Sequence, residues 1–255
     1  MTQPANRRVI VEATADAANR FACALFKTIM CESTAQRGVC HIALSGGTTP
    51  RGLYQQLAAE AASGDVPWQH AEVFFGDERD VPHDHVESNY RMAQRTLLDH
   101  LPIEPSRVHP MPADAADLPV AAAEYEVVIR KKIPADKDGI PRFDLILLGM
   151  GGDGHVASLF PRGEALEECR RLVTAYFVPV LGRHRMTFTY PIINAARNVV
   201  FLVTGEDKAE AAQKVLQGGP DVWRELPAAG VALRDGVLFF VLDAPAASRT
   251  GLHAV

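Results

Sequence analysis

The stretch HIALSGGTTPRGLYQQLA, residues 41–58, leads from an apolar run through small polar residues and glycines into a segment with helical spacing. Leu44 ends a predicted strand, and Pro50 suits the first position of a helix because its ring already holds a helical φ. Gly46 and Gly47 permit the tight turn that such a junction needs. The stretch therefore predicts a strand that passes directly into a helix.

The same alternation continues along the chain. Apolar runs of strand length lie at 39–44, 72–75, 143–148, 172–178, 199–203 and 237–242, and several are continuous, as in strands covered on both faces. Helical spacing is found at 15–31, 51–62, 89–98, 120–132 and 208–216. This pattern predicts an α/β fold with an open, doubly wound, mainly parallel sheet and helices on both faces. Because 101–118 and 133–142 read as loops, we expect one domain over residues 1–255.

Composition excludes several classes of partner. The 255 residues are 47% hydrophobic with a formal net charge of −5, and Lys and Arg are scattered, so nothing indicates a surface for nucleic acid or an anionic membrane. No apolar stretch reaches the roughly 18 residues that span a bilayer, and the N-terminal segment does not resemble a signal peptide. We expect a cytoplasmic protein. Four cysteines without metal-site spacing, and a His83/His85 pair without a third ligand, indicate no metal.

Ligands of open parallel sheets collect at the carboxyl ends of the strands, so the residues after each apolar run are the candidates. After 39–44 come Ser45, Gly46, Gly47 and Thr48, whose backbone N–H groups and hydroxyls at a helix start suit a phosphate. The spacing and the lysine of a nucleotide P-loop are absent. A plain capped turn remains the alternative.

Two further strand ends carry cations. Asp77, Glu78 and Arg79 follow 72–75, and Arg79 could bind a phosphate with an acidic neighbour fixing its orientation, although a solvated charge cluster is the alternative. Ser88 or Asn89 then reads as a helix cap. Lys208 opens the 208–216 segment, where a cation opposes the helix dipole, so anion binding would explain it and a solvated lysine is the alternative.

The segment FDLILLGMGGDGHVASLFP, residues 143–161, brings Asp153 and His155 to the sheet edge after a glycine-rich turn. A histidine placed there beside a carboxylate suits acid–base chemistry. The glycines also match the dinucleotide pattern GxGxxG, but Pro161 cuts the helix short and no acidic residue ends the following strand. We therefore expect no nicotinamide cofactor.

Together, SGGTTP, GDERDVP with SNYRMA, GMGGDGHVASLFP and TGEDKAEA resemble the glucosamine-6-phosphate isomerase/6-phosphogluconolactonase family over roughly residues 9–242, and among its members the lactonases. The resemblance implies an open α/β fold shared with glucosamine-6-phosphate deaminase and ribose-5-phosphate isomerase. It also implies a hydrolase without metal or cofactor, which converts 6-phospho-D-glucono-1,5-lactone to 6-phosphogluconate in the oxidative pentose phosphate pathway. Its partner is then a phosphorylated sugar lactone, and we expect a monomer or small homo-oligomer.

Carried over to this chain, the family motif makes His155 the general base, followed by Val156 where the family often has Thr. We hypothesise that Asp153 or Asp77 orients the imidazole. Phosphate-binding groups are expected at Ser45, Gly46, Gly47, Thr48, Arg79, Lys208 and Arg185, and oxyanion donors at Gly151 and Gly152. The alternatives are a glucosamine-6-phosphate deaminase or a sugar-phosphate isomerase of the same fold, a sugar-phosphate sensor without catalysis, and a nicotinamide oxidoreductase. In the deaminase we would expect Asp-Glu-Tyr where this chain has Asp-Glu-Arg at 77–79.

Overall fold

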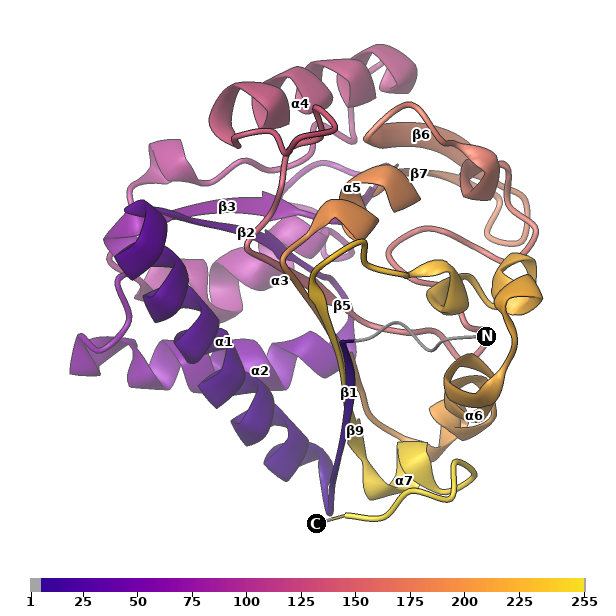
Figure 1. Ribbon diagram of the computed structural model, residues 1–255. Helices are drawn as coiled ribbons and strands as arrows, with labels where there is room; N and C mark the ends of the chain where they lie inside the picture. The colour runs from indigo at the N-terminus through magenta and orange to yellow at the C-terminus, as the bar shows by residue number, and fades with distance from the viewer. Residues whose placement is uncertain (1–5, 255) are drawn as a thin grey trace.

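The main sheet of the computed structural model, which describes residues 6–254, has six strands in the order β1-β9-β8-β5-β2-β3 (Figure 1). Each neighbouring pair is parallel. The strands are β1 (Arg7–Glu12), β2 (Cys40–Leu44), β3 (Ala71–Phe75), β5 (Leu145–Leu148), β8 (Asn198–Val203) and β9 (Val237–Asp243). This confirms the predicted fold class, although β1 was not foreseen.

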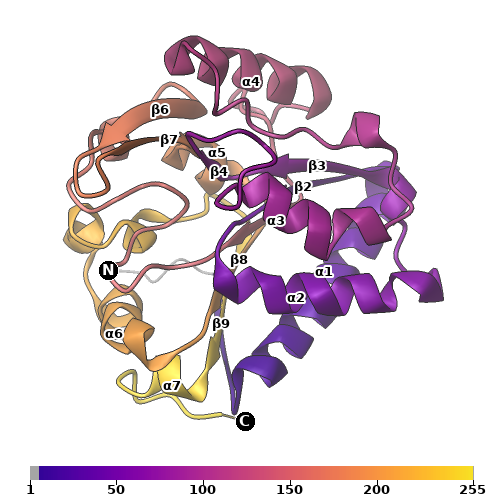
Figure 2. The ribbon, with the colours of Figure 1, turned by 180° about the vertical axis from the view of Figure 1, so that it is seen from behind.

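Helices cover both faces of this sheet. Figures 1 and 2 show α1 and α2 on one side of β8 and β9, and α6 on the other. The α-helices are α1 (Ala15–Arg37), α2 (Thr48–Glu60), α3 (Asn89–Thr96), α4 (Leu118–Lys132), α5 (Tyr190–Ala195), α6 (Ala209–Gln217) and α7 (Ala244–Ala247). The short 3-10 helices are η1 (Ala61–Ser63), η2 (Trp68–His70), η3 (Leu98–His100), η4 (Pro105–Arg107), η5 (Glu164–Glu167), η6 (Glu206–Lys208), η7 (Pro220–Arg224) and η8 (Pro227–Gly230).

The helix ends differ from the prediction where the backbone supplies a cap. α1 continues past the expected end at residue 31 until Gly38, whose φ of 75° lets its N–H bond to Thr34 O. α2 begins at Thr48 rather than at residue 51, with Pro50 inside its first turn. The helix therefore starts directly at the glycine turn.

A second, antiparallel sheet holds β4 (Asp77–Arg79), β7 (Arg183–Phe188) and β6 (Val173–Val178), in the order β4-β7-β6. The predicted strand 172–178 thus lies outside the main sheet. Its side chains are only partly covered, with Phe177 exposed, which suits an antiparallel strand with one solvated face. α4 packs against β6 (Figure 1).

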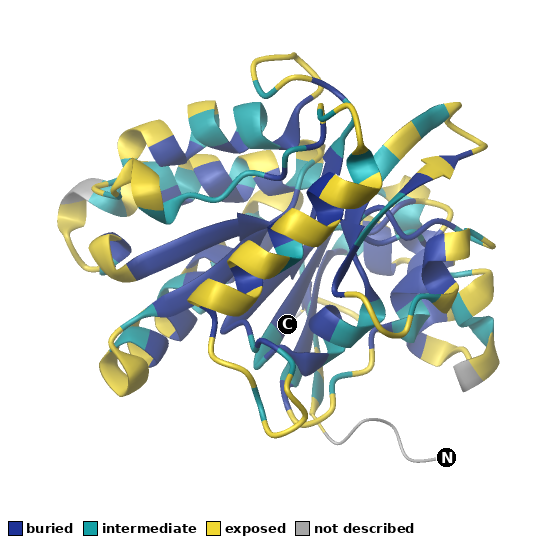
Figure 3. Cartoon of the chain, turned by 90° about the horizontal axis from the view of Figure 1, so that it is seen from above, coloured by how far each residue is buried: buried dark blue, intermediate teal, exposed yellow. Residues whose placement is uncertain are grey.

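The central strands are buried throughout, as Figure 3 shows by their dark blue colour between helices with exposed outer faces. Phe201 on β8 stacks on its register partner Phe240 on β9, with ring centroids 4.7 Å apart. The apolar core is continuous between the two sheets. Within residues 6–254, no helix combines the length and the apolar character that crossing a membrane requires.

Asp144 directly precedes β5, at the amino end of that strand, and is almost fully buried among basic side chains. Its carboxylate lies 3.0 Å from Arg37 Nε, 3.3 Å from Arg197 Nε and 3.4 Å from His41 Nδ1, and it also accepts the His41 N–H. Burial alone would raise the pKa of Asp144, but these hydrogen bonds and charges outweigh burial and lower it. One carboxylate therefore ties together α1, β2 and the residue that precedes β8.

The strand order predicts a crevice at the carboxyl ends of the strands, opposite the end where Asp144 lies. From β2 the chain moves to β3 on one side, and it later returns to β5 on the opposite side of β2. Connections that leave two adjacent strands in opposite directions leave a crevice at their carboxyl ends. Residues that follow β2 and β5 therefore face each other there, and a Cβ on Gly149 would lie 4.0 Å from Ser45 Oγ.

Candidate active site

A cleft of about 340 Å³ opens at this crevice. Residues from four strand ends and from the small sheet line it, namely Ser45, Gly46, Gly47, Thr48, Thr49, Pro50, Asp77, Arg79, Asn89, Gly149, Met150, Gly151, His155, Ala157, Ser158, Phe160, Leu181, Arg185 and Lys208. Most of the predicted site residues are thus brought to one place. Asp153 and Gly152 are not part of the lining.

The turn after β2 presents the start of α2 to the cleft. Gly47 occupies the cap position with φ 98°, and no side chain caps the helix, so the N–H groups of its first turn are left for a ligand. The Tyr54 hydroxyl braces the turn by accepting the Ser45 N–H at 3.0 Å and donating to Ser45 O at 2.7 Å. This geometry suits the binding of an anion.

Asn89 locks this turn against the neighbouring strand end. A Cβ on Gly46 would lie 1.7 Å from Asn89 Oδ1, so only glycine lets the amide pack there. The Asn89 amide nitrogen donates to Asp77 O at 3.0 Å and to Asp77 Oδ1 at 3.2 Å. The helix cap expected at Ser88 or Asn89 is Ser88, whose hydroxyl accepts the Arg91 N–H. Sequence spacing gave no sign of the role of Asn89 in the cleft.

Glu78 points away from the cleft and is fully buried. Its carboxylate accepts the backbone N–H groups of Arg79, Asn89 and Tyr90 and the hydroxyl of Ser88. Burial raises the pKa of Glu78, and the three backbone donors partly offset that rise. The side chain therefore closes the base of the loop formed by residues 80–88.

Two arginines stand side by side on the wall of the cleft. Arg79 on β4 and Arg185 on β7 are register partners across an antiparallel pair. Burial lowers the pKa of Arg185, and the positive charge of Arg79 lowers it further. Like charges placed opposite each other in a sheet repel, which is unfavourable. An anion bound between Arg79 and Arg185 would offset that repulsion. Lys208 adds a third cation, held 2.7 Å from Asp207 Oδ2.

His155 is fixed on two sides. Its Nδ1 lies 2.6 Å from Asp153 Oδ1, and its ring stacks on Phe160 with centroids 4.5 Å apart. Burial alone would raise the pKa of Asp153, but the hydrogen bond and charge of His155 outweigh burial and lower it. Within residues 6–254, Nε2 has no hydrogen-bond partner, so this nitrogen is available to a ligand or a water.

The structure corrects two of the expected roles. Asp77 does not contact His155: its Oδ2 accepts the Ser158 hydroxyl at 2.8 Å, and its Oδ1 accepts from Asn89. The carboxylate that is hydrogen-bonded to the imidazole is that of Asp153.

Gly151 does not offer a free oxyanion donor either, because its N–H bonds to His155 O at 2.9 Å. Gly152 is exposed and lies outside the cleft lining. The glycines serve the histidine instead. A Cβ on Gly151 would lie 2.1 Å from His155 Nδ1, so glycine leaves the space that the imidazole occupies.

Three residues of the 143–161 segment line the cleft although the sequence did not point to them: Ala157, Ser158 and Phe160. Ser158 is buried and holds Asp77, and Phe160 supports the imidazole. Ala157 adopts φ 49°, a conformation that is costly for a residue with a side chain. His83 and His85 lie outside the cleft lining: a ring nitrogen of His83 is 2.8 Å from Met111 O, and His85 Nδ1 accepts the Glu87 N–H.

Comparisons with known proteins point to one family. The family model described as glucosamine-6-phosphate isomerases/6-phosphogluconolactonase matches residues 13–240. A 6-phosphogluconolactonase of Synechocystis sp. is 43% identical over 216 residues, covering 85% of this chain and 87% of the relative. One of Streptomyces coelicolor is 37% identical over 228 residues, covering 87% and 86%. The structure of 6-phosphogluconolactonase from Trypanosoma brucei superposes with a TM-score of 0.84 at 28% identity, covering 95% and 98%.

Proposed function

The chain belongs to the glucosamine-6-phosphate isomerase/6-phosphogluconolactonase family, and on that premise we propose that it hydrolyses 6-phospho-D-glucono-1,5-lactone to 6-phosphogluconate, with His155 as general base. The observation that carries the proposal is the joint presence, in one cleft, of an imidazole held by a carboxylate and a set of cations for a phosphate. The lactonase relatives cover most of the chain, which supports the choice of substrate.

The phosphate is held by Arg79, Arg185 and Lys208 together with the N–H groups at the start of α2. Among the charged residues of the lining, these three cations face a single carboxylate, Asp77. Arginine forks bind phosphate oxygens in pairs, and an uncapped helix start adds backbone donors. Such binding lies away from the reacting carbon and serves to orient the ring.

The chemical step uses His155 twice. Neutral Nε2 takes a proton from a water whose oxygen attacks C1 of the lactone, and Asp153 holds the opposite nitrogen in the donor state. The tetrahedral oxyanion forms in a cleft where cations outnumber carboxylates, which lowers its energy. As the bond from C1 to the ring oxygen breaks, the imidazolium returns the proton to that oxygen. The product is the open-chain phosphogluconate.

Timed hydrolysis of freshly generated lactone tests the proposal. We expect His155→Ala to lose roughly 100- to 10,000-fold in kcat, because it removes the general base, and to retain most of the affinity for the phosphate. His70→Ala is the matched control, since His70 is exposed and lies outside the cleft lining.

Turnover of the His155→Ala variant close to that of the wild type would rule out the base. Conversion of an amino sugar phosphate by the wild type without lactone hydrolysis would favour the deaminase alternative. Phosphogluconate binding without hydrolysis above the uncatalysed rate would favour a sensor.

A further inference from the structure

We propose that Arg183 is a positioning residue that holds Arg79 in its binding geometry through the main chain of Glu87. Arg183 itself does not line the cleft. The inference rests on the proposed function, because it concerns the phosphate contact of the same cleft. It adds Arg183, which would act on phosphate binding only through its effect on Arg79.

Among the described residues, few contacts hold the Arg79 guanidinium in place. Its register partner Arg185 carries the same charge, and the two side chains share the cleft wall. Within residues 6–254, the hydrogen bond that the Arg79 guanidinium makes to the protein runs from Nη1 to Glu87 O, at 2.6 Å. The direction of the guanidinium therefore depends on where that carbonyl lies.

The Glu87 carbonyl belongs to the 80–88 loop, which forms no helix or strand. Glu78 anchors the end of this loop through the Ser88 hydroxyl and the Asn89 N–H, and the Ser88 N–H, which shares a peptide unit with the Glu87 carbonyl, donates to His85 O at 3.0 Å. The Glu87 side chain adds a tie from outside the loop, because its Oε2 lies 2.7 Å from Arg183 Nη1. Fixing the side chain of Glu87 also limits the motion of its own carbonyl.

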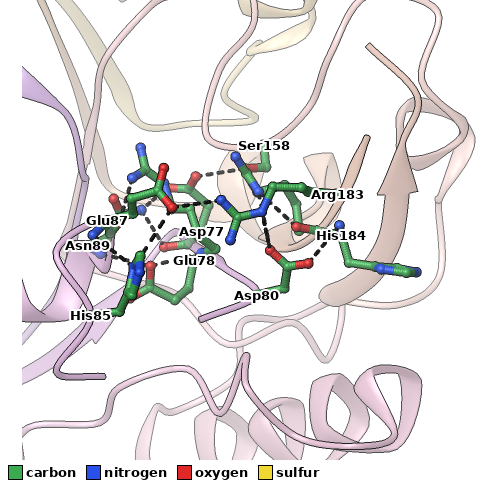
Figure 4. A network of polar contacts seen from close by, with 11 residues as sticks. Asp77, Glu78, Asp80, His85, Glu87, Asn89, Ser158, Arg183 and His184 are labelled. Carbon is green, nitrogen blue, oxygen red and sulfur yellow. Dashed lines mark hydrogen bonds and ion pairs between the residues drawn. The ribbon is translucent and has the colours of Figure 1, made fainter. Parts of the chain in front are cut away.

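Arg183 joins both ends of the loop (Figure 4). It contacts Glu87 near the end of the loop, and its Nε donates to Asp80 Oδ1, at the beginning of the loop, at 3.1 Å. The N–H of the neighbouring His184 donates to Asp80 Oδ2 at 3.1 Å. Arg183 stands at the start of β7, the strand that also carries Arg185. One side chain thus ties the loop to the strand that supplies the second arginine.

All three side chains in these ion pairs are partly exposed to solvent. The side chains of Arg183, Asp80 and Glu87 are 35%, 24% and 50% exposed. Exposed pairs contribute little to global stability, so their effect is local to the loop. The competing explanation is that Arg183 attracts the phosphate from a distance, as any nearby cation would.

Glu87→Ala separates the two explanations, since it removes the carboxylate and keeps the carbonyl. Positioning predicts weaker binding, with KM raised about 2- to 5-fold, as expected from the loss of one exposed pair. Attraction at a distance predicts the reverse, because removing a negative charge near the cleft should lower KM for an anion. For Arg183→Gln, which loses both pairs, positioning predicts a rise in KM of up to about 30-fold with kcat within about twofold.

A double-mutant cycle places the effect at Arg79. In the Arg79→Ala background, Arg183→Gln should change KM by less than about twofold, because the group that it positions is gone. Arg20→Gln is the matched control: it removes the same charge from an exposed ion pair with Asp16 on α1. An undiminished Arg183→Gln effect in the Arg79→Ala background, or a lower KM for Glu87→Ala, overturns the inference.

Hydrogen exchange separates this inference from the proposed function. We expect faster exchange within residues 80–88 for both Glu87→Ala and Arg183→Gln, with unchanged exchange in the main sheet. If both variants show this while the wild type fails to hydrolyse the lactone, the proposed function is wrong and the tie between Arg183 and the loop stands. Unchanged loop exchange in both variants overturns the inference alone.

Discussion

Replacing Gly151 by alanine should disconnect His155 from Asp153 while leaving the phosphate-binding cations in place. The added Cβ would lie 2.1 Å from His155 Nδ1 and 2.4 Å from Asp153 Oδ1, whereas real Cβ contacts essentially never fall under 3.0 Å. The imidazole must therefore retreat by about 1 Å, and a misplacement of that size costs on the order of 100-fold in rate. Complete loss of the base sets the upper limit at about 10,000-fold.

Initial rates of lactone hydrolysis over a range of substrate concentrations give kcat and KM separately. We expect kcat to fall between 100- and 10,000-fold, and KM to change by less than about threefold, because the lost group acts in the transition state. The matched control is Gly219→Ala, since a Cβ there meets nothing within 4 Å. In the His155→Ala background, Gly151→Ala should have little further effect, because both act on the same group. A kcat within about threefold of the wild type for the single variant would refute the reasoning.

Removing one of the phosphate-binding cations should weaken binding: Arg79→Ala and Lys208→Ala should each raise KM by roughly 10- to 100-fold, because each loses a charge-assisted hydrogen bond, with kcat changed far less. Steady-state kinetics check this, and a fall in kcat at constant KM would contradict the assigned phosphate-binding role. Asp144→Asn should lower the free energy of unfolding by about 3 kcal/mol in urea titrations near neutral pH, because it leaves the charges of Arg37 and Arg197 without their buried partner. Since folding lowers the pKa of Asp144, its stabilisation is complete above about pH 4 and is lost as the pH falls below that, so the wild type and the variant should converge in acid. A gap between the two proteins that does not narrow as the pH falls below about 4 would exclude this linkage.

The strand ends could be predicted because two local signals coincide there. Continuous apolar runs such as 143–148 indicate strands of a parallel sheet, and parallel strands bring their carboxyl ends to one edge. That is how Ser45 and His155, which lie far apart in the sequence, could be placed in one cleft.

Pairings between distant residues could not be predicted in the same way. β4 spans only Asp77–Arg79, too short for a periodic signal, and its match to β7 depends on tertiary structure.

The glycine motif was ambiguous for a different reason. A run of glycines indicates free backbone donors or close approach equally well, and only coordinates show that the Gly151 N–H is already bonded and that its missing Cβ makes room for the imidazole.

The pairing of β1 with β9 has a consequence for how the chain is made. Residues Arg7–Glu12 lie beside Leu238–Asp243, so β1 finds its neighbour only after the whole stretch of chain between them has been synthesised. Contacts so distant in sequence are slow to form, and until then the segment stays a separate, unpaired piece. Chains that stop short of β9 would leave the edge of β8 without its neighbour, and an unpaired strand edge can pair with other molecules.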